Sequence, residues 1–232
     1  MDFTLGRTMF LDLKALTTYI PIILSGLSNT FILAFGGFTI GLSLGSILAF
    51  AQTLLPRPIN SIASAVEEIL RSIPLLVLML IIFFGLPEIG VQLDPLTSAI
   101  LAIGLRSLAY QSQIIRGAIL AIPREQIEAA LALGMTRLQS FIYIVLPQAY
   151  RIALPALVNQ LTIDIKDTCL AYAIGVSEMF TQSIHVAQVI LDYLTPLLFV
   201  GIVYFIITIS LSYVSSYLYT KYRMPGLGED HG

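Results

Sequence analysis

Long apolar runs separated by short polar stretches make up most of this chain. A helix needs about 20 predominantly apolar residues to cross the hydrocarbon core of a bilayer. Five segments reach that length, over about residues 19–54, 59–86, 96–122, 141–173 and 195–219. The pattern predicts an all-α integral membrane protein with about five transmembrane helices.

The remaining segments complete the predicted organisation. Residues 1–18 mix charged and apolar positions, which indicates an interfacial segment ahead of a transmembrane domain over about residues 19–220. The polar stretch over about residues 177–192 indicates a re-entrant or external helix. Residues 221–232 form a short tail.

The first apolar run is longer than one straight span requires, so part of it is expected to be interfacial, tilted or curved. Within it, Gly37, Gly41 and Gly45 recur every four residues. Small residues at this spacing are typical of closely packed membrane helices.

Residues 123–147 lack an apolar core long enough to cross a bilayer. Their sequence is PREQIEAALALGMTRLQSFIYIVLP. Pro123 suits the first position of a helix, and Gly134 suits a left-handed cap at its end. Thr136, followed three residues later by Gln139, matches the capping box that begins a second helix. The residues predict a helical hairpin with a glycine turn between two membrane-length segments.

Composition agrees with a membrane protein. Hydrophobic residues make up 57% of the chain, charged residues 11%, and the mean hydropathy is +0.89, whereas soluble domains carry about a quarter charged residues. A net charge of −2 indicates no nucleic-acid partner. The single cysteine, Cys169, excludes an internal disulfide, and two histidines are too few for a metal site. No GxxxxGK[ST] sequence occurs to cradle ATP phosphates, so no catalytic residue or cofactor is assigned to the chain.

Part of the hairpin resembles a known motif. Glu128, Ala129 and Ala130, then Gly134 after three intervening residues and Pro147 at the end, resemble the EAA loop of ABC-importer permease subunits. In that family the loop lies on the cytoplasmic face and docks into a groove of the ATPase subunit. The resemblance assigns these five residues to ATPase coupling and implies the fold of a type I ABC-importer permease. A surface hairpin without a partner is the alternative.

Four further segments narrow the resemblance. Residues 71–76, 109–119, 146–159 and 166–170 are similar to motifs of polar amino-acid permeases of the histidine/glutamine type, although Gln113 stands where that family usually has glutamate. The resemblance implies a subunit of an ABC importer for polar amino acids, in a bacterial or archaeal plasma membrane, that works by alternating access. The implied partners are a separate ATPase that binds ATP and magnesium, a second copy or a homologous permease, an extracytoplasmic solute-binding protein and the amino acid itself.

Orientation follows from the basic residues that flank the predicted spans, because cytoplasmic flanks are enriched in lysine and arginine. With the hairpin inside, seven basic residues lie on the cytoplasmic side and two on the other. An odd number of spans then puts the N-terminus outside and the C-terminus in the cytoplasm. The seven are Arg57, Arg116, Arg124, Arg137, Arg151, Lys221 and Arg223, and the two are Arg7 and Lys14.

Two charged residues fall inside predicted spans, Arg106 in the third and Asp164 in the fourth. A charge near the bilayer centre costs about 2.5–3.5 kcal/mol on insertion scales, so such residues face a cavity or a partner. Arg106 and Asp164 either form an ion pair that joins two spans or line the substrate path. In the path they would bind the carboxylate and the ammonium of an amino acid.

Three more residues are candidates for the substrate path. Arg71 is also spaced for a pair with Glu67 or Glu68 on one helix face. Glu178 and Gln182 lie four residues apart and would face the cavity together, with a solvated helix face as the alternative.

Three other functions fit parts of the sequence. The chain could be the structural, non-binding half of a heterodimeric permease. An ATP-independent secondary transporter would use Arg106 and Asp164 as an ion relay, and the EAA spacing speaks against it. An intramembrane enzyme would need a histidine at membrane depth, whereas His185 and His231 fall outside the clear spans.

Overall fold

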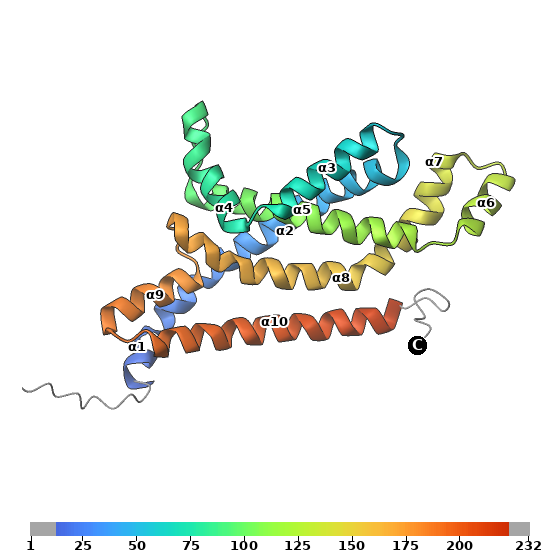
Figure 1. Cartoon of the computed structure of the whole chain (residues 1–232). Coiled ribbons are helices and arrows are strands. Elements are labelled where there is room, and N and C mark those ends of the chain that lie inside the picture. The colour runs from blue at the N-terminus through green and yellow to red at the C-terminus, as the bar shows by residue number, and fades with distance from the viewer. Residues whose placement is uncertain (1–12, 223–232) are drawn as a thin grey trace, which may run out of the picture.

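The computed structural model describes residues 13–222, and all regular structure in that range is helical (Figure 1). The predicted interfacial segment, residues 1–18, and the predicted tail, residues 221–232, lie largely outside the described residues. The helices are α1 (Leu13–Ser25), α2 (Leu27–Leu54), α3 (Ile59–Ser72), α4 (Leu75–Leu80), η1 (Ile81–Gly85), η2 (Leu86–Ile89), α5 (Pro95–Leu120), α6 (Arg124–Ala132), α7 (Arg137–Ser140), η3 (Phe141–Val145), α8 (Leu146–Asp167), η4 (Thr168–Ile174), α9 (Met179–Ile190) and α10 (Leu194–Tyr222).

Helices occupy all five predicted spans, but they differ in how well they suit a membrane. Among the described residues, three continuous helical stretches are long and apolar enough to cross it, namely Thr17–Leu54, Arg137–Ile174 and Leu194–Tyr222. The pair Ile59–Ser72 and Leu75–Ile89 qualifies together and is bent by 98°. The remaining long helix, α5, has 26 residues and does not qualify, because polar and charged residues occupy its middle.

The polar helix α5 lies at the centre of the fold, against α2, α3 and α8. Its contact with α2 depends on the predicted glycines. A Cβ at Gly41 would lie 2.8 Å from the Cβ of Ser107, and one at Gly45 would lie 2.9 Å from the carbonyl oxygen of Leu108. Neither distance leaves room for a side chain, so the predicted close helix packing is confirmed.

The helices place two sets of connections at opposite ends of the bundle (Figure 1). The turn between α2 and α3, the α6–α7 hairpin and the end of α10 lie at the right-hand end, which we call the hairpin end. Helices α1 and α9 and the start of α10 lie at the other end. The segment from α4 to η2 projects from the bundle as a separate arm.

Candidate translocation path and coupling hairpin

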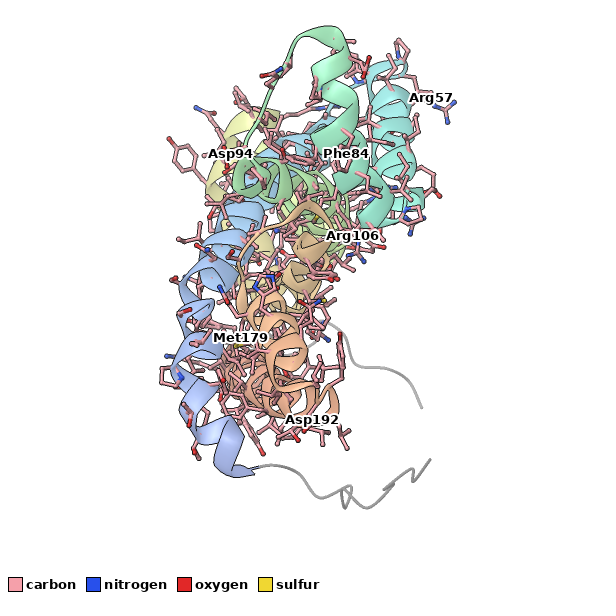
Figure 2. All side chains as sticks on the ribbon, turned by 90° about the vertical axis from the view of Figure 1, so that its left-hand side faces the viewer. Arg57, Phe84, Asp94, Arg106, Met179 and Asp192 are labelled. Carbon is pink, nitrogen blue, oxygen red and sulfur yellow. The ribbon has the colours of Figure 1, made fainter. Side chains whose placement is uncertain are left out.

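Arg106 forms an ion pair with Asp167, which joins the first half of α5 to the end of α8. The side chains are 25% and 19% exposed, so both charges remain accessible from one side. The guanidinium also lies over the ring of Tyr110, 5.4 Å from its centroid. Viewed along the bundle, Arg106 lies near the middle of the cross-section, between the arm that carries Phe84 and the end marked by Asp192 (Figure 2).

The predicted ion pair between Arg106 and Asp164 is wrong. Asp164 lies one helical turn before Asp167, is 2% exposed and accepts hydrogen bonds from the Ser107 hydroxyl at 2.7 Å and the Gln160 amide at 2.8 Å. Neutral donors therefore satisfy Asp164, which faces the interior, whereas Asp167 faces the accessible side.

A chain of polar side chains extends from Asp164 to α2. The Gln111 amide donates to the Ser107 hydroxyl at 2.8 Å and to the carbonyl oxygen of Phe38 at 3.1 Å. These groups are buried at the place where Gly41 allows α2 to approach α5. Because hydrocarbon offers no alternative partners, the chain ties α2, α5 and α8 together.

Arg71 pairs with Glu68 at 2.7 Å, three residues earlier on α3, which confirms the predicted helix-face pair. Their side chains are 37% and 61% exposed. Arg71 lies at the end of α3, immediately before the 98° bend into α4. This pair therefore lies where a predicted span is broken.

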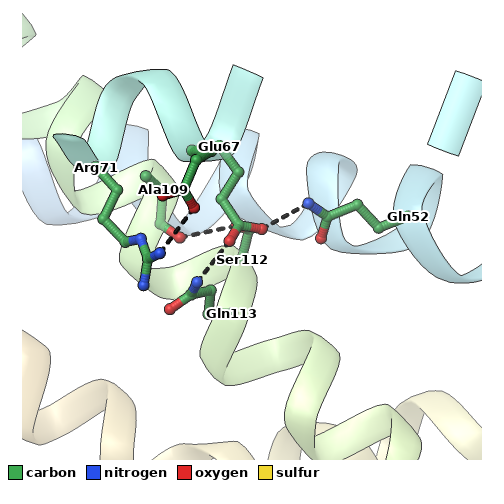
Figure 3. A network of polar contacts seen from close by, with 7 residues as sticks. Gln52, Glu67, Arg71, Ala109, Ser112 and Gln113 are labelled. Carbon is green, nitrogen blue, oxygen red and sulfur yellow. Dashed lines mark hydrogen bonds and ion pairs between the residues drawn. The ribbon is translucent and has the colours of Figure 1, made fainter. Parts of the chain in front are cut away.

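Glu67 forms a buried network that the sequence pattern does not predict (Figure 3). Its side chain is 4% exposed. The carboxylate accepts from the Gln52 amide at 2.5 Å, the Gln113 amide at 2.6 Å and the Ser112 hydroxyl at 3.2 Å. Two helices, α2 and α5, thus supply donors to one carboxylate on α3. The available signal was the set of amides and hydroxyls at positions 52, 112 and 113 inside apolar runs.

Glu178 is fully buried and caps the start of α9, so it does not line an open path as predicted. It accepts from the backbone of Phe180 at 2.8 Å and of Thr181 at 2.6 Å. The hydroxyl of Tyr204 on α10 donates to it at 3.0 Å. Gln182, the other residue predicted on this helix, is half-buried.

The hairpin forms as the sequence predicts. Gly134 has a φ of +86°, a left-handed conformation that ends α6 and that favours glycine. The backbone amide of Gln139 donates to the Thr136 hydroxyl at 3.2 Å, and the Gln139 side chain accepts from the Thr136 amide at 2.8 Å, so the capping box is confirmed. Pro123 is the residue before α6 rather than its first residue.

The hairpin presents one side outward and fixes the other to the bundle. Glu128 and Ala129 are exposed, whereas Ala130 is 2% exposed. Beneath them, Ile127 packs on the cluster that contains Phe141. A hydrogen bond from the Gln148 amide to Gln126, at 2.8 Å, also holds the hairpin in place. Pro147 lies in the first turn of α8.

Apolar side chains add to the outward surface of the hairpin. Leu133 is 85% exposed and Leu138 is 63% exposed. Only residues 121–123 separate α5 from α6, so a force on the hairpin reaches α5 through a short connection. The arrangement suits a rigid element that docks against another protein.

Residues 41–224 match the family model described as binding-protein-dependent transport system inner membrane component. The chain belongs to this family. It is 33% identical to the arginine transport system permease protein ArtQ of Bacillus subtilis (strain 168), over 93% of this chain and 99% of that protein. It is 36% identical to the glutamine transport system permease protein GlnP of Escherichia coli (strain K12), over 89% and 95%.

A solved structure supports the same family. "Crystal structure of an amino acid ABC transporter with histidines" superimposes with a TM-score of 0.85 at 32% identity, and the match covers 92% of this chain and all of that chain. The resemblance to ABC-importer permeases is thereby confirmed, and so is the all-α type I permease fold. The chain is an inner-membrane transport component that passes the membrane several times.

Proposed function

We propose that this chain is the permease subunit of an ATP-driven importer for polar amino acids. The observation that carries the proposal is the exposed EAA hairpin, which is joined through three residues to the helix that carries Arg106. One helix thus connects the surface that would contact the ATPase with the charges that would contact substrate. Relatives named for arginine and glutamine transport support the amino-acid class.

Arg106 and Asp167 are proposed to form the substrate site, with Arg106 taken from the sequence and Asp167 in the role first expected of Asp164. An amino acid carries a carboxylate that suits a guanidinium fork and an ammonium that suits a carboxylate. A bound zwitterion would replace the ion pair by two new pairs of opposite charge. The site therefore recognises the common part of amino acids, and the side chain would be read by other groups.

Coupling is proposed to follow alternating access. When ATP draws two ATPase subunits together, the hairpins held in their grooves move with them. Because the connection over residues 121–123 is short, this motion is transmitted to α5. The close contacts of Gly41 and Gly45 with α5 then move α2 together with it. ATP binding then needs to bias two packed states by only a few kcal/mol.

The proposed assembly contains two permeases, two ATPases that hold ATP and magnesium, and an extracytoplasmic solute-binding protein. The second permease is either another copy or a homologue. The hairpin end faces the cytoplasm, so the N-terminus lies outside and the C-terminus inside. This chain itself binds no nucleotide, and hydrolysis takes place on the ATPase.

Purification from native membranes in mild detergent, with mass spectrometry and an ATPase assay, tests the assembly. We expect a P-loop ATPase in stoichiometric amount. Isolation of the chain alone, with solute movement in liposomes without ATP, would favour a secondary transporter instead. Co-purification of a second, different permease would show a heterodimer, in which this chain could be the structural, non-binding half.

Glu128→Lys tests the coupling role. We expect normal insertion but loss of ATP-driven uptake, because the substituted residue reverses the charge on the outward side of α6. Glu88→Lys is the matched control, since Glu88 is also exposed but lies on the η2 arm, away from the hairpin. Coupled uptake by Glu128→Lys at the level of the control would contradict the coupling role.

A further inference from the structure

One face of α5 carries an accessible line of residues at helical spacing. Arg106, Tyr110 and Gln113 follow one another at three- and four-residue steps, and Gly117 continues the line. Residues so spaced lie on one side of a helix. The first three are half-buried and Gly117 is exposed, whereas their neighbours Ser107, Gln111 and others on the opposite side are buried. The open face of α5 is therefore polar from its middle toward the hairpin end.

Both ion pairs found among the described residues adjoin this face. Arg106 and Asp167 lie at its outer part. Arg71, paired with Glu68, lies within electrostatic range of Glu67 and close enough to Tyr110 to be placed beside the inner part. Each pair joins one guanidinium to one carboxylate, so each has no net charge and presents both signs to the accessible side.

The Gln113 side chain adds an acceptor beside Arg71, and Glu67 fixes its orientation. A carboxylate only accepts hydrogen bonds, so the amide nitrogen of Gln113, which donates to Glu67 at 2.6 Å, has to face it. The carbonyl oxygen Oε1 then points the other way (Figure 3). This oxygen accepts no hydrogen bond from any residue within 13–222.

We propose that Arg71, Glu68 and the Gln113 carbonyl form a second station for the amino acid, inward of Arg106 and Asp167. Arg71 binds the substrate carboxylate, while Glu68 and Gln113 Oε1 receive its ammonium. Glu67 is a positioning residue that holds the Gln113 amide in the required orientation. The assignment rests on the proposed function, since it concerns the same substrate.

The two stations suit stepwise movement. Seven residues separate Arg106 from Gln113, which corresponds to about 10 Å along a helix. An amino acid that leaves the outer pair allows Arg106 and Asp167 to close on each other again, so no charge is left unpaired in the membrane. At the inner station, Arg71 and Glu68 likewise bind the amino acid in place of each other and pair again when it leaves. The Tyr110 ring lies between the stations.

Substrate protection of introduced cysteines tests the path. In a Cys169→Ser parent, reconstituted with its ATPase and binding protein, Gly117→Cys places a thiol just inward of Gln113. A Cβ at Gly117 meets no atom within 4 Å. Gln92→Cys is the control, because Gln92 is exposed in the loop before α5, where a charged reagent can reach the thiol. The two variants are labelled with a charged thiol reagent, with and without L-arginine or L-glutamine.

We expect Gly117→Cys to be labelled and to be protected by whichever amino acid the parent transports. Gln92→Cys should be labelled equally with and without the amino acid. Equal labelling of Gly117→Cys with and without a transported amino acid would overturn the inner station while leaving the importer proposal intact. A parent with no ATP-dependent uptake of any amino acid would overturn both.

A second test uses substrate chemistry. Arg71→Gln should reduce the preference for the transported amino acid over its α-amide (L-arginine over L-argininamide, or L-glutamine over L-glutaminamide) by about tenfold, because the amide lacks the carboxylate that the charged fork binds. A purely structural loss would lower uptake of both compounds equally and leave the ratio unchanged, which would contradict the assignment. Arg57→Gln, an exposed arginine in the turn before α3, is the control and should keep the parent ratio.

Glu67→Gln separates positioning from binding. Glutamine at position 67 can donate as well as accept, so it no longer forces the Gln113 carbonyl toward the path. We expect lower kcat for uptake with an unchanged ratio between the transported amino acid and its α-amide. A changed ratio in this variant would show that Glu67 binds substrate itself and would overturn its role as a positioning residue.

Discussion

Helices α5 and α10 have similar lengths, 26 and 29 residues, and opposite surroundings. In α10 the most apolar stretch of 18 residues has a mean hydropathy of 2.3, and 6% of that stretch is buried. Only Thr195, Pro196 and Val200 are buried on it. In α5 the buried residues include Ser98, Ser107, Gln111 and Ser112. The helix at the centre is thus the polar one, and the helix at the periphery is the apolar one.

The exposed hydroxyls of α10 are satisfied differently from the buried hydroxyls of α5. On α10, Thr208, Ser210 and Ser212 donate to carbonyl oxygens three or four residues earlier on the same helix. On α5, Ser107 and Ser112 reach carboxylates of other helices. A polar group that faces lipid has to be satisfied locally, whereas one inside the bundle can join helices. Hydropathy therefore identifies lipid-facing helices better than it identifies the functional one.

The first prediction removes the charge that most distinguishes α5. Arg106→Leu leaves Asp167 without its partner in a part-buried contact, so the cost should lie below the roughly 3–5 kcal/mol that breaking a fully buried ion pair costs. We expect ATP-driven uptake to be lost and thermal stability in detergent to fall. Fluorescence-detected size exclusion after heating measures the second effect.

The exchange Arg106→Asp with Asp167→Arg sharpens that prediction. It restores opposite charges across the same contact, so stability should largely return. Uptake should stay low, because each substrate charge then meets its group on the wrong helix. Full recovery of uptake would mean that the pair is structural only.

The second prediction concerns the contact between α2 and α5. Gly41→Leu places a side chain where the Cβ alone would lie 2.8 Å from Ser107. Overpacking of this kind typically costs about 1–3 kcal/mol, and we expect a lower unfolding temperature. Gly201→Leu on α10 is the control and should leave the temperature unchanged, since open space surrounds Gly201.

The third prediction tests what the two helices share. Each begins with an aspartate that accepts from a threonine three residues later, Asp94 with Thr97 and Asp192 with Thr195. The hydrogen bond from the threonine hydroxyl is the main reason that the pKa of each carboxyl lies below its usual value of 3.8. Because the folded pKa is lowered, the stabilisation is present above about pH 4, the unfolded value. It is lost as the pH falls through the folded value.

Thermal scans at pH 7 and at pH 3 measure this effect. We expect Asp94→Ala and Asp192→Ala to lower the unfolding temperature modestly at pH 7 and less at pH 3. Asn variants at the same positions should keep a cap without the acid dependence. A loss that is equal at both pH values in the Ala variants would contradict a role for the ionised carboxylates.

The smallest expected effect is on α10. Thr208→Val and Ser210→Ala remove hydroxyls that bond only within their own helix, so each should change stability by less than about 0.5 kcal/mol. Ser107→Ala on α5 is the comparison and should cost more, because it leaves Asp164 and Gln111 short of a partner. Similar losses of stability for the α5 and α10 variants would contradict the distinction between hydroxyls that join helices and hydroxyls that bond within their own helix.

Local signals in the sequence were sufficient for the hairpin. Gly134 and the Thr136–Gln139 capping box act within one or two turns of the chain, so their geometry follows from nearby residues alone. The glycine spacing on α2 was informative for the same reason. The partner of those glycines, Ser107 on α5, could not be derived, since spacing indicates a packing face without indicating which helix covers it.

The charged residues show where sequence reasoning ended. It identified Arg106 as needing a partner but selected Asp164 instead of Asp167, which lies one turn further along. That choice depends on the rotation and axial shift of α8 relative to α5, which no local pattern encodes. Glu178 was missed as a cap, although Thr181 follows it at the spacing that also joins Asp94 to Thr97.

The low hydropathy of α5 has a consequence for biosynthesis. A segment with Arg106 and two glutamines near its middle partitions poorly into lipid by itself. When α5 leaves the ribosome, α2 and α3 already exist and can offer the Phe38 carbonyl and the Glu67 carboxylate. Asp167 is synthesised only after the hairpin. Arg106 therefore meets its partner only once α8 has been made, so we expect α5 to complete its insertion together with α8 rather than before it.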